Sequence, residues 1–128
     1  MKLVTQELEN LFKKFPIRSQ ENKRGDAIVL VKYFNPTGVG TWYITEAGKE
    51  TNGKYLFYGY CHLGDDQMAE LGYVSQEELE SLKLPFGLTI ERDLYLPEKT
   101  TLNEALRSDG IGVPSYLLNK KSKEREER

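Results

Sequence analysis

Carboxylates are the side chains whose number and spacing could do chemistry in this chain. Residues 65–93 contain eight Asp or Glu residues and two basic residues, a local charge of −6. Five of these carboxylates could meet at one end of a sheet and hold a hard cation such as Mg²⁺, which prefers oxygen ligands: Asp65, Asp66, Glu70, Glu91 and Asp93. Metal-dependent nucleases use such sites. Acidic residues are also common in turns and helix starts, so we expect no metal site and keep the nuclease as a minor alternative.

The triplet Glu91-Arg92-Asp93 suggests a structural cluster of charges. On a strand, alternation puts Glu91 and Asp93 on one face and Arg92 on the other. The two carboxylates could then hold a basic side chain from elsewhere, such as Arg18 or Lys32. We therefore expect a structural role for this triplet ahead of partner binding or metal catalysis.

Nucleophilic and phosphate-binding chemistry is poorly supported. Cys61 and His62 are the only Cys and the only His, and neighbours on one strand point to opposite faces, so the imidazole cannot activate the thiol. A structural zinc site needs about four Cys or His ligands. The segment Gly38-Val39-Gly40 lacks the lysine and hydroxyl of a P-loop. We predict no catalytic residues, no cofactor and no enzymatic activity.

Aromatic side chains are concentrated on three central segments predicted as strands. Beside lysines, an exposed aromatic sheet could stack the bases of single-stranded nucleic acid. The candidates for this role are Tyr43, Tyr58, Lys32 and Lys54. Aromatic strands more often fill the core, and a net charge of −2 opposes strong binding to phosphates. A nucleic-acid accessory factor is therefore the alternative hypothesis.

The periodicity of apolar residues predicts an α+β fold. A helix is expected over residues 5–15, capped by Thr5 and ended by Pro16. Capping boxes at Ser75/Glu78 and Thr101/Glu104 predict helices over residues 76–83 and 102–107, the first burying Leu79 and Leu82. β-Branched and aromatic runs predict strands over residues 27–34, 41–46, 54–62, 68–74 and 88–96. We expect an antiparallel sheet of about five strands with two or three helices, mainly on one face.

Length and composition bound the organisation of the chain. We expect one domain over residues 1–118 and a charged, disordered tail over residues 119–128. No apolar run reaches the roughly 20 residues that cross a bilayer. A single cysteine rules out an internal disulfide and fits a reducing compartment, so we predict a cytoplasmic location.

An ordered set of short motifs resembles a known family. The motifs are Phe34–Pro36, Thr41–Glu46, Gly59, Glu70–Tyr73, Glu78–Leu79 and Glu91–Asp93. Their order and spacing resemble those of domain-of-unknown-function family 2958, over about residues 2–96. Members are often encoded on conjugative plasmids, integrative elements and phages, so the resemblance implies an accessory protein of a mobile element. It supplies no catalytic residues.

The leading hypothesis from the sequence is therefore a small non-enzymatic binding protein. It would contact a protein of the host or of the element, such as a nucleic-acid-handling or defence protein, through an acidic face. That face is predicted to contain Asp65, Asp66, Glu70, Glu77 and Glu80.

Overall fold

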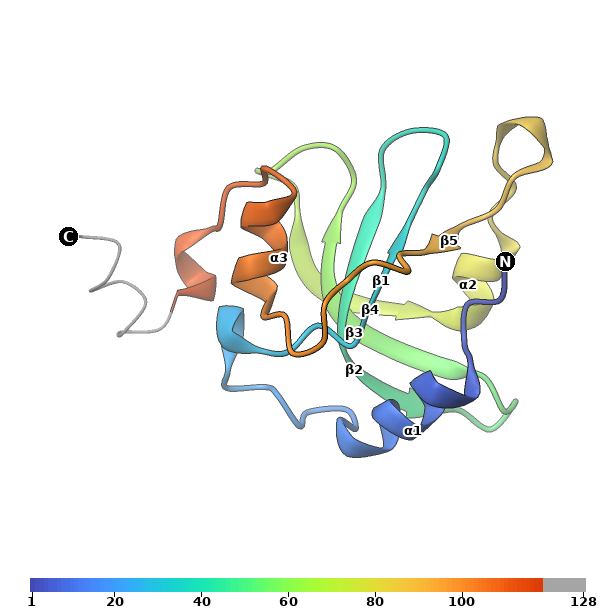
Figure 1. Ribbon diagram of the computed structural model, residues 1–128, viewed down its shortest axis with the longest axis horizontal. Helices are drawn as coiled ribbons and strands as arrows, with labels where there is room; N and C mark the ends of the chain where they lie inside the picture. Colours follow the sequence, from blue (N-terminus) through green and yellow to red (C-terminus); the bar gives the residue numbers. More distant parts are fainter. Residues whose placement is uncertain (119–128) are drawn as a thin grey trace.

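The computed structural model describes residues 1–118, and the tail predicted to be disordered, residues 119–128, lies outside the described part. Residues 1–118 form the predicted α+β fold, a five-stranded antiparallel sheet with three α-helices (Figure 1). The strands are β1 (Val31–Phe34), β2 (Thr41–Lys49), β3 (Tyr55–His62), β4 (Glu70–Ser75) and β5 (Glu91–Arg92). The α-helices are α1 (Gln6–Lys14), α2 (Gln76–Ser81) and α3 (Leu102–Ser108). Three short 3-10 helices complete the chain: η1 (Arg24–Asp26), η2 (Pro85–Gly87) and η3 (Ser115–Leu117).

The first four strands form a meander, and the sheet order is β4-β3-β2-β1-β5. The turn between β1 and β2 is held by Asn35, whose side chain accepts a hydrogen bond from the Thr37 amide and donates one to the Val39 carbonyl. The fifth strand returns to pair with β1 on the far side, which leaves β4 and β5 as the two edges.

The centre of the sheet contains an irregularity that requires a glycine. The register of β2 against β3 shifts between Ile44 and Glu46. Gly59 lies opposite this shift, and a Cβ atom there would lie 1.9 Å from the carbonyl oxygen of Tyr43. Because that oxygen belongs to the backbone of a paired strand, only glycine allows the two strands to approach this closely.

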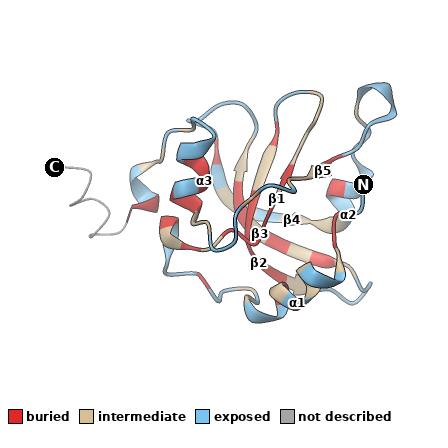
Figure 2. Cartoon of the chain, viewed as in Figure 1, coloured by how far each residue is buried: buried red, intermediate tan, exposed pale blue. Residues whose placement is uncertain are grey.

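The two faces of the sheet carry separate cores. The face under α1 and α2 buries Phe12, Tyr33, Ile44, Phe57 and Leu79. The opposite face, under α3 and η3, buries Tyr43, Tyr60, Leu102, Leu106 and Leu117. Two of the three α-helices therefore share one face, and α1 and α3 lie on opposite sides of the sheet (Figure 1), while the buried residues follow the central strands (Figure 2).

All three predicted helix starts are confirmed. The Thr5 side chain accepts a hydrogen bond from the Leu8 amide. Both capping boxes are complete, with Ser75 accepting from the Glu78 amide and Thr101 from the Glu104 amide. Each of these signals involves only residues within the first turn of its helix, so it does not depend on the rest of the fold.

Several predicted boundaries were wrong. The first strand begins at Val31, since Ile28 makes only an isolated bridge with Thr101. The strand predicted over residues 88–96 is limited to Glu91–Arg92. It ends there because the Asp93 side chain accepts a hydrogen bond from the Tyr95 amide and forms a turn. Helix α2 ends at Ser81, so Leu82 is 41% exposed rather than buried.

No helix within residues 1–118 combines the length and the apolar character that crossing a membrane requires.

Candidate functional site

Strand β4 is an open edge of the sheet. It pairs with β3 on one side, and no strand of the described chain pairs with its other side. Proteins usually protect such edges with lysine, proline or a bulge, because unpaired backbone groups attract further strands. The six residues of β4 contain neither lysine nor proline, and Tyr73 in the strand is 60% exposed.

The predicted acidic face is divided between the two ends of β4. Asp65 and Asp66 lie in the turn that precedes the strand, and Glu70 is its first residue. Glu77 and Glu80 lie on α2, which begins directly after the strand ends. Six residues of extended chain separate the two groups by about 17 Å. The structure thus does not gather the five carboxylates into one cluster but places them around both ends of one edge.

Four of the five carboxylates already have partners, and among them the Asp65 side chain accepts a hydrogen bond from the backbone amide of Gln67 at 2.9 Å. Glu80 pairs with Lys54 at 2.6 Å, Glu77 accepts from the Asn52 amide at 3.1 Å, and Asp66 contacts His62 Nε2 at 2.6 Å. The hydrogen bond from Lys54 lowers the pKa of Glu80, and the one from His62 lowers the pKa of Asp66. All five carboxylate residues are exposed. Both ends of the edge therefore carry negative charge at neutral pH.

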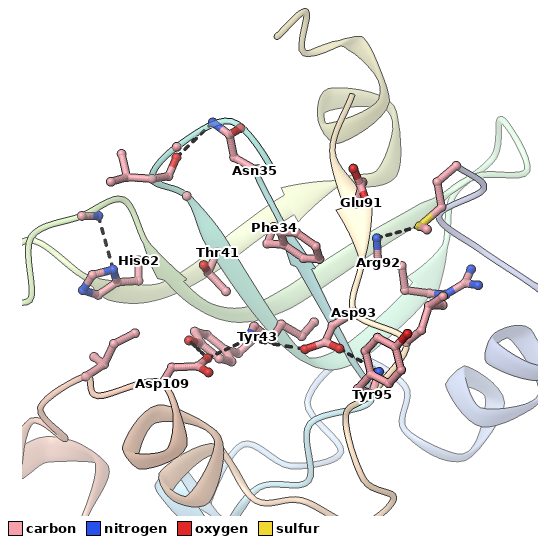
Figure 3. Close-up of a pocket in the computed structure, with 18 residues that line it drawn as sticks. Phe34, Asn35, Thr41, Tyr43, His62, Glu91, Arg92, Asp93, Tyr95 and Asp109 are labelled. Carbon is pink, nitrogen blue, oxygen red and sulfur yellow. Dashed lines mark hydrogen bonds and ion pairs between the residues drawn. The ribbon is translucent and has the colours of Figure 1, made fainter. Parts of the chain in front are cut away.

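A cleft of about 790 Å³ lies on the α3 side of the sheet (Figure 3). It is bordered by the β1–β2 turn, by residues 91–95 and by the end of α3. Lys32 Nζ lies 2.7 Å from Asp109 Oδ2 and 3.6 Å from Asp93 Oδ2. The Tyr43 hydroxyl donates to the same Asp109 oxygen at 2.5 Å. The polar floor is therefore a closed network that joins β1, β2, the turn after β5 and the end of α3.

Three of the polar side chains that line this cleft, Tyr43, Lys32 and His62, are held by other groups of the protein. Burial and the hydrogen bond to Asp109 raise the pKa of Tyr43, so its hydroxyl stays protonated and acts as a donor. Lys32 is held between the carboxylates of Asp93 and Asp109. The His62 ring contacts Asp66 through Nε2 and the Gly64 amide through Nδ1. Lys32, Tyr43 and His62 are thus each held by hydrogen bonds or ion pairs, whereas Glu91, which also lines the cleft, makes no ion pair within the described residues.

The residues proposed for nucleic-acid binding do not form a surface. Tyr43 is fully buried and Lys32 is enclosed in the cleft network, so neither side chain has the exposure that the alternative hypothesis requires. Lys54 lies at the β2–β3 hairpin and pairs with Glu80. Tyr58 is partly buried and packs edge-to-face on Tyr73 at 4.9 Å. Core packing took priority because removing apolar surface from water is the dominant favourable contribution to folding.

The charged triplet takes two separate roles. Asp93 contacts Lys32, one of the two cations considered for it. Arg92 donates to the Lys2 carbonyl at 2.7 Å, and Glu91 makes no ion pair within the described residues. The other cation considered, Arg18, pairs with Glu21. Asp109 was not predicted, because only the folded chain brings the end of α3 next to Lys32.

The carboxylates considered as a metal site lie on opposite edges of the sheet. Asp65, Asp66 and Glu70 border β4, whereas Glu91 and Asp93 belong to β5 and the turn after it. Four strand spacings separate these edges by about 19 Å. Residues 1–118 contain no group of three or more His, Cys, Asp or Glu side chains that could hold a metal ion.

Comparison with known proteins identifies the family but not an activity. Residues 3–109 match the family described as a protein of unknown function (DUF2958). The match covers most of the chain, which therefore belongs to this family. No curated protein and no solved structure matched the chain.

Proposed function

We propose that this member of the DUF2958 family is a small non-enzymatic accessory protein of a mobile genetic element, which binds another protein through the acidic edge. The acidic edge is defined here as strand β4 together with Asp65, Asp66, Glu77 and Glu80. The observation that carries the proposal is an edge strand whose outer side pairs with no strand of residues 1–118, with exposed carboxylates around both of its ends. The association with mobile elements rests on what is implied by the family resemblance.

The charge of the edge favours a protein partner with a basic surface. Exposed carboxylates repel nucleic-acid phosphates, whose binding depends on neutralisation by Lys and Arg. The same carboxylates attract the basic channels of proteins that handle nucleic acid, and such attraction speeds association. A nucleic-acid-handling or defence protein therefore fits this surface better than a nucleic acid does.

The state of the cleft supports binding over catalysis. Catalysis by a nucleophile requires an attacking group and a base in reach of each other. In the cleft, Lys32, Tyr43 and His62 are instead occupied by internal hydrogen bonds and ion pairs. An internal network of this kind stabilises the fold and positions the surrounding loops.

The test is a pull-down from host lysate with and without nuclease, using a charge-reversed variant. Glu70→Lys/Glu77→Lys changes one residue near each end of β4. Glu7→Lys/Glu98→Lys is the matched control, because it makes the same change of net charge at exposed sites, and Glu7, like Glu77, is the second residue of a helix. We expect a protein that resists nuclease treatment, is lost with the first variant and is retained with the control. Retention by both variants, with circular dichroism showing both folded, would overturn the proposal.

A further inference from the structure

We propose that the partner adds an extended segment as a sixth strand beside β4, with an apolar centre and Lys or Arg at both ends. This inference rests on the proposed function and specifies how the acidic edge recognises its partner. It combines three features of the edge: its unpaired backbone, the side chains that flank it and the distribution of charge.

The backbone of β4 supplies the first part of the argument. In an antiparallel pair, only alternate residues bond to the neighbouring strand, so an edge strand has amide and carbonyl groups that point outward. A peptide that adds as a strand satisfies these groups and gains affinity from them. The other edge, β5, has two residues and then the turn held by Asp93, so it is too short to receive a comparable strand. Within the described chain, β4 is the edge of useful length.

The side chains of β4 supply specificity for an apolar centre. Leu71 and Tyr73 face the α3 side of the sheet, because they pair with Tyr60 and Tyr58. On the other face, a Cβ atom at Gly72 would meet nothing within 4 Å, so there is open space beside the strand. An added strand would pair its own side chains with Leu71 and Tyr73 on one face and fill the space at Gly72 on the other. β-Branched and aromatic residues suit such cross-strand positions.

The charges exclude a second copy of this chain as the preferred occupant. If two copies of β4 paired antiparallel, the Glu77/Glu80 end of one copy would lie beside the Asp65/Asp66/Glu70 end of the other. If they paired parallel, identical acidic ends would meet. Like charges placed opposite each other are destabilising in both arrangements. A segment with basic residues at both ends instead meets opposite charge at each end.

The probe for this mode is a synthetic peptide with the core Thr-Val-Tyr-Val-Thr and two lysines at each end. Binding to the full chain is followed by amide NMR signals of residues 70–75. The matched control has the same core with two glutamates at each end. We expect saturable shifts of the β4 amides with the first peptide, and affinity lower by roughly tenfold or more with the second, since several exposed ion pairs are lost.

Backbone methylation distinguishes strand addition from attraction between charges alone. Two versions of the basic peptide carry N-methyl groups at alternate core positions, odd in one and even in the other. Strand addition predicts that one version loses binding and the other keeps it, because only one edge of the peptide faces β4. Equal binding by both versions would overturn the inference while leaving the charge-dependent pull-down intact. Shifts of the β4 amides that depend on protein concentration alone would also overturn it, because they would assign the edge to a second copy.

Discussion

Removing the charge of Lys32 should destabilise the protein by about 2 kcal/mol. The Lys32 side chain is 16% exposed, and its partners Asp93 and Asp109 are 23% and 30% exposed. Losing one partner of a buried ion pair costs about 3–5 kcal/mol, and an exposed pair contributes about 0.2–1 kcal/mol. Lys32→Met leaves two partly buried carboxylates without their shared cation, so the expected loss lies between these ranges.

The control for this prediction is an ion pair of the same length on the surface. Lys54 Nζ lies 2.6 Å from Glu80, against 2.7 Å for Lys32 and Asp109. The side chains of Lys54 and Glu80 are 44% and 36% exposed, so Lys54→Met should destabilise the protein much less than Lys32→Met does. The difference in stability loss between Lys32→Met and Lys54→Met should therefore come from burial of the ion pair and not from its length.

The assay is urea unfolding at neutral pH, followed by circular dichroism. The slope of the free energy of unfolding against urea should be unchanged, because neither variant alters the surface exposed on unfolding by much. Raising the salt concentration should reduce the effect of Lys54→Met proportionally more, since exposed pairs are screened more strongly. Equal losses for the two variants, or a larger loss at Lys54, would refute the reasoning.

Three further results are expected from stability measurements. Gly59→Ala should lower the free energy of unfolding by about 3 kcal/mol or more, because the added Cβ meets a backbone carbonyl. Gly72→Ala, directly opposite in β4, should leave that free energy unchanged or raise it by about 0.5 kcal/mol. Similar losses for the two variants in urea unfolding would contradict this. Tyr43→Phe should lose about 2 kcal/mol with its bond to Asp109, while Tyr60→Phe should change stability little, because the buried Tyr60 hydroxyl has no partner of acceptable geometry within residues 1–118. Burial raises the pKa of Tyr60 to about 12, whereas a free tyrosine ionises near pH 10. The stability of the fold is therefore unaffected by this hydroxyl below about pH 10 and falls as the pH rises from there toward 12. An absorbance titration in which all tyrosines of the folded protein ionise near pH 10 would contradict this.

The elements that could be predicted from the sequence are those specified by local chemistry. The two capping boxes begin α2 and α3 at the expected residues, because each box needs only the side chains and amides of one helical turn. The three central strands were recognisable from β-branched and aromatic runs. Their aromatics Tyr33, Tyr43, Phe57 and Tyr60 fill the two cores, the more common fate of such residues.

The features that escaped prediction depend on how distant segments meet. The network of Lys32 with Asp109 joins β1 to the end of α3, and no spacing in the sequence signals that contact. The exposed edge at β4 follows from the order of strands in the sheet, which periodicity does not reveal. The acidic residues were recognised as a group and a strand was expected over residues 68–74, but only the structure shows that this strand is an open edge of the sheet.

Hydrogen exchange of the β4 amides is the most direct test of the proposed binding surface. It should be measured for the full chain alone and in complex with the protein captured in the pull-down. Amides in residues 70–75 that point away from β3 should exchange readily in the free protein, since no described strand pairs with them. The account predicts that these amides gain protection in the complex. Unchanged exchange in β4, with new protection around the cleft of Lys32 and Asp109 instead, would contradict it.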